Sequence, residues 1–66
     1  MRKIVFADNL KKLRIENNLS QKDLAEKLNV NFRTISAWET SVCEPSLEML
    51  VKIAEIFNET LDDLLF

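Results

Sequence analysis

Short runs of apolar residues at helical spacing are the feature that most constrains the fold of this 66-residue chain. Phe6, Leu10 and Leu13 recur at intervals of four and three residues, which places them on one face of a helix. A longer run of the same kind follows in residues 47–57. The alternating pattern of a strand is limited to a short stretch at Lys3–Phe6. The spacing therefore predicts an all-α fold.

Capping residues separate the runs and predict where each helix begins and ends. Ser20-x-x-Asp23 and Thr60-x-x-Asp63 have the form of a capping box, in which each side chain accepts a hydrogen bond from the backbone of the other residue. The chain contains no glycine, so we expect asparagines to take the left-handed conformation after the first two helices, at Asn18 and Asn29. The five expected helices span residues 5–17, 20–28, 31–39, 46–57 and 60–66.

The expected helices are short enough to pack around one core, and we expect a single compact domain over residues 1–66. Their connections are of a length normal for a small all-α bundle, and five helices would form it. The predicted core faces comprise Phe6, Leu10 and Leu13; Leu24, Ala25 and Leu28; Ile35 and Trp38; and Leu47, Leu50, Ile53, Ala54 and Phe57.

The composition offers little chemistry for an enzyme or a metal centre. The chain has no histidine, no tyrosine and a single cysteine, Cys43, so we expect neither a disulfide framework nor a zinc site. A domain this small also leaves little room for a buried reactive pocket. No apolar stretch reaches the length of a membrane span, and the N-terminus lacks the pattern of a signal peptide. We therefore expect a cytoplasmic protein that is not an enzyme and binds no cofactor or metal.

The two halves of the chain have opposite charge, although the net charge is only −2. Residues 1–38 contain eight basic and four acidic residues, whereas residues 39–66 contain one basic and seven acidic residues. A basic half is the electrostatic feature expected where a protein contacts phosphates. Uneven charge on ordinary solvated helices would give the same distribution, so charge alone does not decide between the two interpretations.

The expected helix at residues 31–39 follows the helix at 20–28 after a short turn, which is the layout of a helix-turn-helix. Ile35 and Trp38 share its apolar face. The opposite face is a mixture that suits base edges in a major groove, since Arg binds guanine and apolar groups contact the thymine methyl. Alternatively, Phe32 folds back over the turn against the preceding helix. The residues of this outer face are Phe32, Arg33, Ser36, Ala37 and Thr40.

Three motifs together resemble the helix-turn-helix family of the phage repressors and Cro. They are Ser20-Gln21-x-x-Leu24-Ala25, Thr34-Ile35-Ser36-x-Trp38-Glu39 and Pro45-Ser46-Leu47-x-x-Leu50, the last leading to Ile53-Ala54. The resemblance covers the chain from about Phe6 to Leu65. It implies a five-helix bundle whose third helix enters the major groove of double-stranded DNA.

The resemblance also implies roles for individual residues. Arg14 and Glu39 match a structural ion pair that joins the first helix to the end of the third. Family members often carry Gln, Arg or Lys at the positions of Phe32 and Ala37, so the base-facing set of this chain is poorer in hydrogen-bonding groups. For Gln21, a plain solvated helix residue is the alternative. The implied base contacts are Phe32, Arg33, Ser36 and Ala37, and the implied contacts to the DNA backbone are Gln21, Asn31, Thr40 and Ser41.

The C-terminal half carries more apolar residues than the predicted core requires. Met49 and Ile56 fall to one side of the core stripe, and the chain ends in Leu64-Leu65-Phe66. Surplus apolar surface marks an interface, and the resemblance suggests a two-fold dimer with its recognition helices about one turn of DNA apart. Alternatively, Met49 and Ile56 only widen the core. The predicted interface residues are Met49, Ile56, Leu65 and Phe66.

These observations predict a sequence-specific transcriptional regulator that binds double-stranded DNA as a homodimeric repressor, without a separate domain for sensing a ligand. One alternative is an antitoxin-like regulator that also binds a partner protein through its acidic half. Another is a protein-interaction module that has this fold and does not bind DNA. Salt-dependent binding to duplex DNA distinguishes the regulators from the interaction module.

Overall fold

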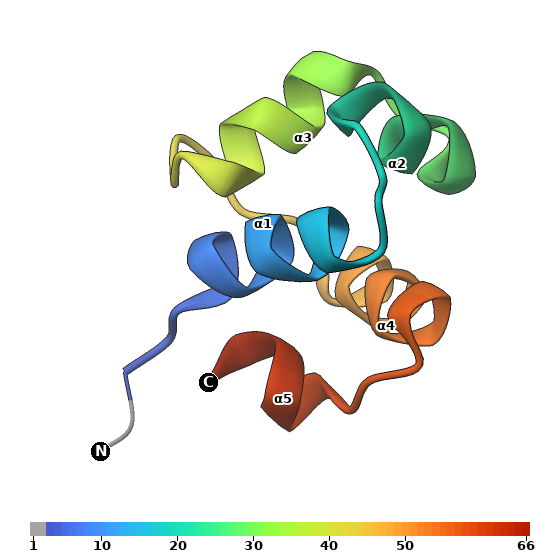
Figure 1. Ribbon diagram of the computed structural model, residues 1–66. Helices are drawn as coiled ribbons and strands as arrows, with labels where there is room; N and C mark the ends of the chain where they lie inside the picture. Colours follow the sequence, from blue (N-terminus) through green and yellow to red (C-terminus); the bar gives the residue numbers. More distant parts are fainter. Residues whose placement is uncertain (1–2) are drawn as a thin grey trace.

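The computed structural model describes residues 3–66, and within this range the chain forms five α-helices and no strand (Figure 1). The predicted all-α fold with five helices is therefore confirmed. Arg2, which counts toward the basic half of the sequence, lies outside the described residues. The helices are α1 (Phe6–Glu16), α2 (Gln21–Leu28), α3 (Phe32–Glu39), α4 (Leu47–Phe57) and α5 (Leu61–Leu65).

The short strand-like pattern at Lys3–Phe6 does not form a strand, and the last residue of that stretch already begins α1. The backbone N–H of Val5 donates to the carbonyl of Leu65 at 2.7 Å. The side chain of Asn9 adds a second link, from Nδ2 to the carbonyl of Leu64 at 3.0 Å. These hydrogen bonds join the beginning of α1 to α5, where strand pairing would have required an extended partner.

Helix α1 lies between two pairs of helices (Figure 1). Helices α2 and α3 pack against each other on one side of it, and α4 and α5 lie on the other side. Contacts of α1 with both α3 and α5 tie the two pairs together. The pair α2 and α3, joined by the turn at residues 29–31, is a helix-turn-helix at the surface of the bundle.

Side-chain caps begin helices α2 to α5 at the residues that the sequence predicts. Ser20 and Asp23 form a complete capping box: the hydroxyl accepts from the Asp23 N–H at 3.0 Å, and the carboxylate accepts from the Ser20 N–H at 2.9 Å. Asn31 Oδ1 accepts from the N–H two residues further on at 2.8 Å. The hydroxyls of Ser46 and Thr60 each accept from the third residue onward, which at Thr60 is one of the two hydrogen bonds of the predicted box.

Asparagines take the backbone conformation that glycine usually supplies. Asn18 and Asn29 have φ angles of 57° and 56°, as predicted, and Asn58 after α4 has a φ of 54°. Ser41, in the loop after α3, has a φ of 61°. The left-handed region is costly for most residues, but asparagine tolerates it because its short polar side chain forms local hydrogen bonds. A chain without glycine can therefore still make tight turns after its helices.

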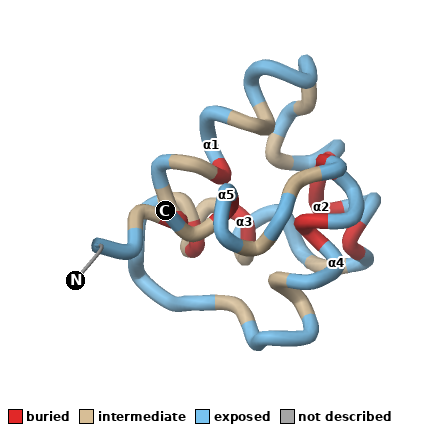
Figure 2. The backbone as a smooth tube through the Cα atoms, turned by 90° about the horizontal axis from the view of Figure 1, so that it is seen from below, coloured by how far each residue is buried: buried red, intermediate tan, exposed pale blue. Residues whose placement is uncertain are grey.

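The core lies where the helices face one another, and Figure 2 shows the buried segments gathered there. One predicted core residue is wrong, since Leu47 is 70% exposed, and Met49 packs against the core instead. At 3.6 residues per turn, Leu47 lies only about 20° around α4 from the buried Ala54, so helical periodicity does not explain its exposure. Leu47 is the first residue of α4. The fully buried large side chains are Leu10, Leu24, Leu28, Ile35, Ile53 and Leu64.

Candidate nucleic-acid interface

The outer face of α3 carries the residues that the sequence assigns to DNA bases. Ile35 is fully buried and Trp38 is 5% exposed, so these two residues anchor the helix on the bundle. Phe32 and Arg33 are exposed at the beginning of α3, Phe32 to 40%. The apolar anchors and the outer face are thus separated as the spacing predicts. Ser36 and Ala37, the other two residues assigned to bases, are half-buried.

Two cations lie over the ring of Phe32. Nζ of Lys22 in α2 is 5.7 Å from the ring centroid, and Cζ of Arg33 is 5.8 Å from it. Both distances fall within the roughly 6 Å at which a ring attracts a cation. Phe32 therefore does turn toward α2, as the alternative interpretation expects, but it meets a charged side chain there and lies outside the buried cluster.

Lys22 was not among the site residues predicted from the sequence. It lies in the first turn of α2, directly after Gln21, and reaches the beginning of α3 ten residues further along the chain. A basic residue next to a predicted phosphate-contacting residue is the signal that could have identified it. Its contact with Phe32 is a tertiary one, which no spacing rule within a single helix contains.

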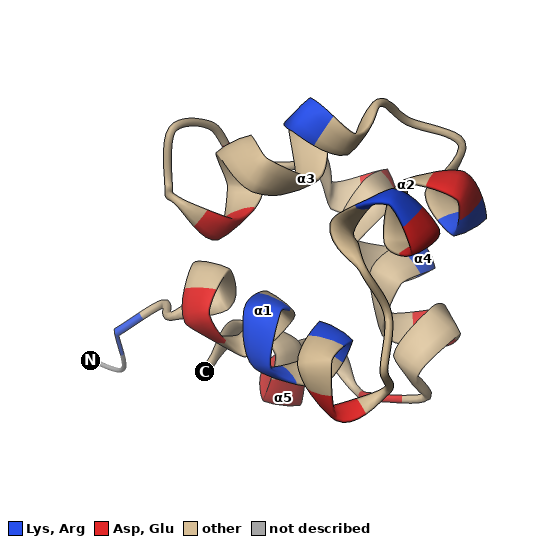
Figure 3. Cartoon of the chain, turned by 45° about the horizontal axis from the view of Figure 1, so that its top comes forward, with Lys and Arg blue, Asp and Glu red and all other residues tan. Residues whose placement is uncertain are grey.

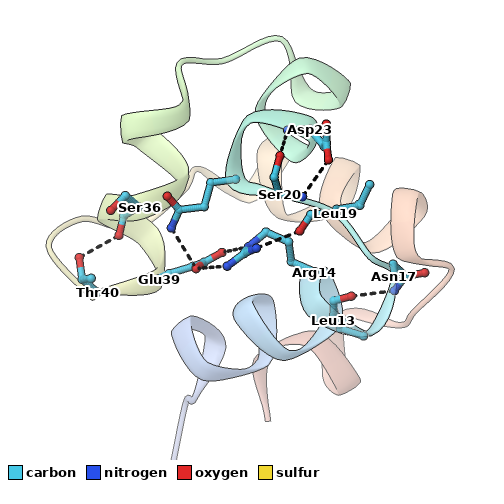
Figure 4. A network of polar contacts seen from close by, with 10 residues as sticks. Leu13, Arg14, Asn17, Leu19, Ser20, Asp23, Ser36, Glu39 and Thr40 are labelled. Atoms are coloured by element: carbon cyan, nitrogen blue, oxygen red, sulfur yellow. Dashed lines mark hydrogen bonds and ion pairs between the residues drawn. The ribbon is translucent and has the colours of Figure 1, made fainter.

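The residues assigned to the DNA backbone lie around the two ends of α3. Asn31 is exposed and uses Oδ1 to cap α3, so its amide nitrogen is the atom that can donate to a phosphate. Gln21 is half-buried, and its Nε2 donates to Glu39 Oε1 at 3.3 Å, which brings it close to the end of α3. Thr40 Oγ1 donates to the carbonyl of Ser36 at 2.8 Å (Figure 4). Ser41, the fourth residue assigned to the DNA backbone, is exposed.

Arg14 and Glu39, which the resemblance pairs, are in contact in the structure (Figure 4). Nε of Arg14 lies 2.7 Å from Glu39 Oε2, and Nη1 donates to the carbonyl of Leu19 at 2.9 Å. The two side chains are only 12% and 3% exposed. The hydrogen bond to Glu39 raises the pKa of Arg14 above its ordinary value, although partial burial acts in the opposite direction. The guanidinium therefore stays charged and holds the carboxylate.

The opposite charges of the two halves of the sequence are only partly separated in space. Figure 3 shows basic residues on α1, α2 and α3, but acidic residues lie on the same three helices as well as on α5. Helices α2 and α3 together hold three basic residues, Lys22, Lys27 and Arg33, and three acidic ones, Asp23, Glu26 and Glu39. These two helices therefore have no net positive charge, and attraction to a phosphate backbone would have to come from individual basic side chains such as Arg33.

The four residues predicted to form a dimer interface are placed differently from one another. Met49 and Leu65 are half-buried and pack against the core. Ile56 and Phe66 are 37% and 41% exposed. Helix α4 exposes two further apolar residues, one turn apart, which the sequence reasoning did not assign to an interface: Leu47 and Val51.

One cleft lies between residues 3–8 and the loop at 41–45. It has a volume of about 480 Å³, and Val5, Trp38 and Leu50 contribute to its apolar lining. The exposed thiol of Cys43 lies at this cleft. Over the described range 3–66, His, Cys, Asp and Glu residues form no group able to hold a metal ion, and no helix has the length and apolar character to cross a membrane.

A family model described as helix-turn-helix matches residues 10–64 of the chain. The HTH-type transcriptional activator BcrR of Enterococcus faecalis is 42% identical over 60 residues, which cover 91% of this chain and 29% of BcrR. The HTH-type transcriptional regulator MJ0272 of Methanocaldococcus jannaschii is 42% identical over 57 residues, which cover 86% of each protein. The chain therefore spans less than a third of the length of BcrR and most of the length of MJ0272.

The solved structures that are similar to this chain include the P22 c2 repressor in complex with a synthetic operator. The two share a TM-score of 0.85 and 25% sequence identity over 98% of this chain and 96% of the repressor chain. The residues matched by the family model include α2, the turn and α3, which are the parts that build the exposed face described above. The chain belongs to the helix-turn-helix family of transcriptional regulators.

Proposed function

We propose that this protein is a sequence-specific transcriptional regulator that binds double-stranded DNA as a dimeric repressor, with residues 1–66 forming one DNA-binding domain. The observation that carries the proposal is the exposed face of α3, where Phe32 and Arg33 are exposed while the anchors Ile35 and Trp38 are buried. An α-helix exposed along one face fits the width of the major groove. The similar P22 c2 repressor, whose structure contains an operator, supports this use of the fold.

In the proposed complex, the side chains around α3 divide into two roles. Arg33 donates two hydrogen bonds to a guanine, and Phe32 presents an apolar group to the same groove. Ser36 and Ala37 lie further along the face. Because their side chains are short, they let α3 approach the bases more closely there. Contacts to phosphates fix the register of the helix on the duplex but carry no sequence information. They come from Gln21, Asn31, Thr40 and Ser41.

A second copy is part of the proposal because one recognition helix covers only a few base pairs. Two joined subunits place two α3 helices about one turn of DNA apart, and the second contact becomes effectively intramolecular. The exposed side chains of Ile56 and Phe66 supply apolar surface for this interface, next to the half-buried Met49 and Leu65. Repression requires only that the bound dimer occupies a promoter, whereas activation also requires a surface for the transcription machinery.

Selection of binding sites from random-sequence duplexes tests the proposal directly. The full chain is mixed with the duplex pool, and the bound duplexes are recovered, amplified and sequenced over several rounds. We expect a palindromic consensus whose half-sites lie about one turn of DNA apart. Binding to this consensus should weaken as salt rises. No enriched sequence, together with no salt-dependent binding at micromolar protein, would instead favour a protein-interaction module.

A further inference from the structure

Phe32 has surroundings that neither core packing nor hydrogen bonding to bases explains. Its ring is 40% exposed and lies outside the buried cluster, yet Lys22 Nζ and Arg33 Cζ lie over it at 5.7 Å and 5.8 Å. The ring attracts both cations through its quadrupole and restricts where they can move. Lys22, Phe32 and Arg33, here called the ring cluster, therefore present an apolar surface bordered by two positive charges.

We propose that Phe32 determines specificity by contacting the C5 methyl group of a pyrimidine next to the guanine that Arg33 binds. This inference rests on the proposed function, since it concerns the same DNA-binding face. The phenyl ring has no N–H or O–H donor and no carbonyl acceptor, and the apolar group that a base pair offers in the major groove is the thymine methyl. An exposed phenylalanine on this face thus matches thymine, or 5-methylcytosine, which carries the same methyl group.

The pairing of guanine with cytosine puts this methyl group in a neighbouring base pair, and the dimensions of the ring cluster allow it. The guanine bound by Arg33 pairs with a cytosine, which has no C5 methyl in unmodified DNA. The centroid of the Phe32 ring is 5.8 Å from Arg33 Cζ, which exceeds the rise of about 3.4 Å between base pairs. A methyl group on the next base pair is therefore within reach of the ring. The target contains a thymine·adenine pair next to this guanine in each half-site.

Phe32 is also a positioning residue for Arg33. A bidentate contact requires the guanidinium to align two N–H groups with guanine O6 and N7 at the same time. An arginine held over a ring samples fewer rotamers in the free protein, so it loses less conformational freedom on binding. Lys22, over the same ring, brings a second positive charge to this end of α3, where it can approach a phosphate.

Base analogues in the selected duplex test the methyl contact without changing any base pair. Thymines in the half-sites are replaced one position at a time by deoxyuridine, which lacks only the methyl group. At the position next to the guanine, the dissociation constant of the wild-type protein should rise about fourfold per half-site, as expected for one buried methyl group. Phe32→Ala should bind the thymine and uracil duplexes equally. Uracil at the other positions should have the same effect on both proteins.

A second pair of variants separates the methyl contact from the positioning of Arg33. Phe32→Tyr keeps an aromatic ring, whereas Phe32→Leu keeps an apolar side chain without a ring. Replacing the guanine by 7-deazaguanine removes the N7 acceptor, so it reports the bidentate contact of Arg33. We expect the wild type and Phe32→Tyr to lose affinity for the 7-deazaguanine duplex to a similar extent and Phe32→Leu to lose less. Phe32→Leu should still distinguish thymine from uracil.

The outcomes separate this inference from the proposed function. If the selection yields a consensus but no thymine-to-uracil change affects wild type and Phe32→Ala differently, the methyl contact is overturned. The protein would still be a sequence-specific DNA-binding protein. Equal sensitivity of Phe32→Leu and wild type to 7-deazaguanine would overturn the positioning of Arg33. The absence of any enriched duplex would overturn both the inference and the function on which it rests. A cytosine at the thymine position should bind more weakly than 5-methylcytosine there, and the reverse order would count against the methyl contact.

Discussion

Arg14 in α1 and Glu39 at the end of α3 form a two-point ion pair, with Nε to Oε2 at 2.7 Å and Nη2 to Oε1 at 3.1 Å. Oε1 also accepts a hydrogen bond from Gln21 Nε2 at 3.3 Å, so one carboxylate joins α1, α2 and α3. Two parallel N–H···O bonds constrain the geometry more than a single bond does. The orientation of α3, and of its exposed face, therefore depends on two residues that lie 25 positions apart in the sequence.

Breaking this ion pair from one side should destabilise the fold more than removing both charges. Arg14→Met leaves the Glu39 carboxylate, whose side chain is 3% exposed, without its cation, at a cost of about 3–5 kcal/mol. Arg14→Met combined with Glu39→Leu should cost less. Chemical denaturation of the wild type, both single variants and the double variant measures the coupling energy. A coupling below about 0.5 kcal/mol would mean that the contact adds nothing to stability.

Arg33→Ala and Gln21→Ala should weaken DNA binding in different ways. Losing a bidentate contact to guanine should cost about 1–3 kcal/mol on the selected duplex and relax the preference at one base pair in each half-site. Losing a phosphate contact from Gln21 should weaken selected and random duplexes alike. Fluorescence anisotropy titrations of both duplexes measure the difference, with Lys27→Ala in the last turn of α2 as a control for overall charge. Equal losses on both duplexes for Arg33→Ala would reassign this residue to the backbone.

The affinity for DNA should depend only moderately on salt. The side chains proposed to contact phosphates are neutral, so these contacts themselves release no counterions; they are Gln21, Asn31, Thr40 and Ser41. Counterions are displaced only by the nearby lysines and Arg33. At about 0.9 ions released per neutralised phosphate, the slope of log K against log salt for a dimer should be roughly −3 to −6. Titrations at four or more salt concentrations give this slope. A slope near zero on the selected duplex would contradict an electrostatic contribution to binding.

The capping box of α2 should lose stabilising energy at low pH. Hydrogen bonds from the backbone and the side chain of Ser20 lower the pKa of Asp23 below its ordinary value of 3.8. Because the pKa is lower in the folded state, the carboxylate stabilises the fold above about pH 3.8, and this contribution is lost as the pH falls through the folded pKa. Asp23→Ala should therefore lower the melting temperature at pH 7 and lower it less at pH 2. Thermal unfolding followed by circular dichroism checks this, and an equal difference at both pH values would contradict it.

Ile56→Glu combined with Phe66→Glu should yield a folded monomer. Both side chains are more than a third exposed, so the helical content should be retained, while two carboxylates are placed on an already acidic surface. The monomer should bind a palindromic duplex at least about tenfold more weakly than the wild type, because the second half-site contact is no longer intramolecular. Its affinity for a single half-site should fall much less. Sedimentation measures the oligomeric state, and circular dichroism measures the helical content.

Leu47→Glu combined with Val51→Glu is the matched control for the interface. Both residues are exposed on α4, but Leu47 lies about half a turn around the helix from Ile56. We expect this variant to remain dimeric. If the control variant is monomeric while Ile56→Glu with Phe66→Glu is dimeric, the interface lies on the side of α4 that carries Leu47 and Val51. If the first variant unfolds, Ile56 and Phe66 belong to the core.

The sequence by itself determined the helices and the residues at their ends. Ser20, Asn31 and Ser46 cap the helices that they were predicted to cap, and Asn18 takes the predicted left-handed conformation. A cap joins a side chain to a backbone group two or three residues away, so the local pattern contains both partners. The split of α3 into an anchored face and an outer face was predictable for the same reason, because helical periodicity places Ile35 and its neighbours.

Only the tertiary structure decided which apolar residues of α4 are buried and what Phe32 contacts. Periodicity locates the apolar stripe of a helix, but the width of the stripe that is covered depends on the neighbouring helices, so Leu47 is exposed and Met49 is not. The contact between Lys22 and Phe32 depends in the same way on how α2 packs against α3. Contacts between separate helices are set by their relative orientation, and no pattern within one helix contains that information.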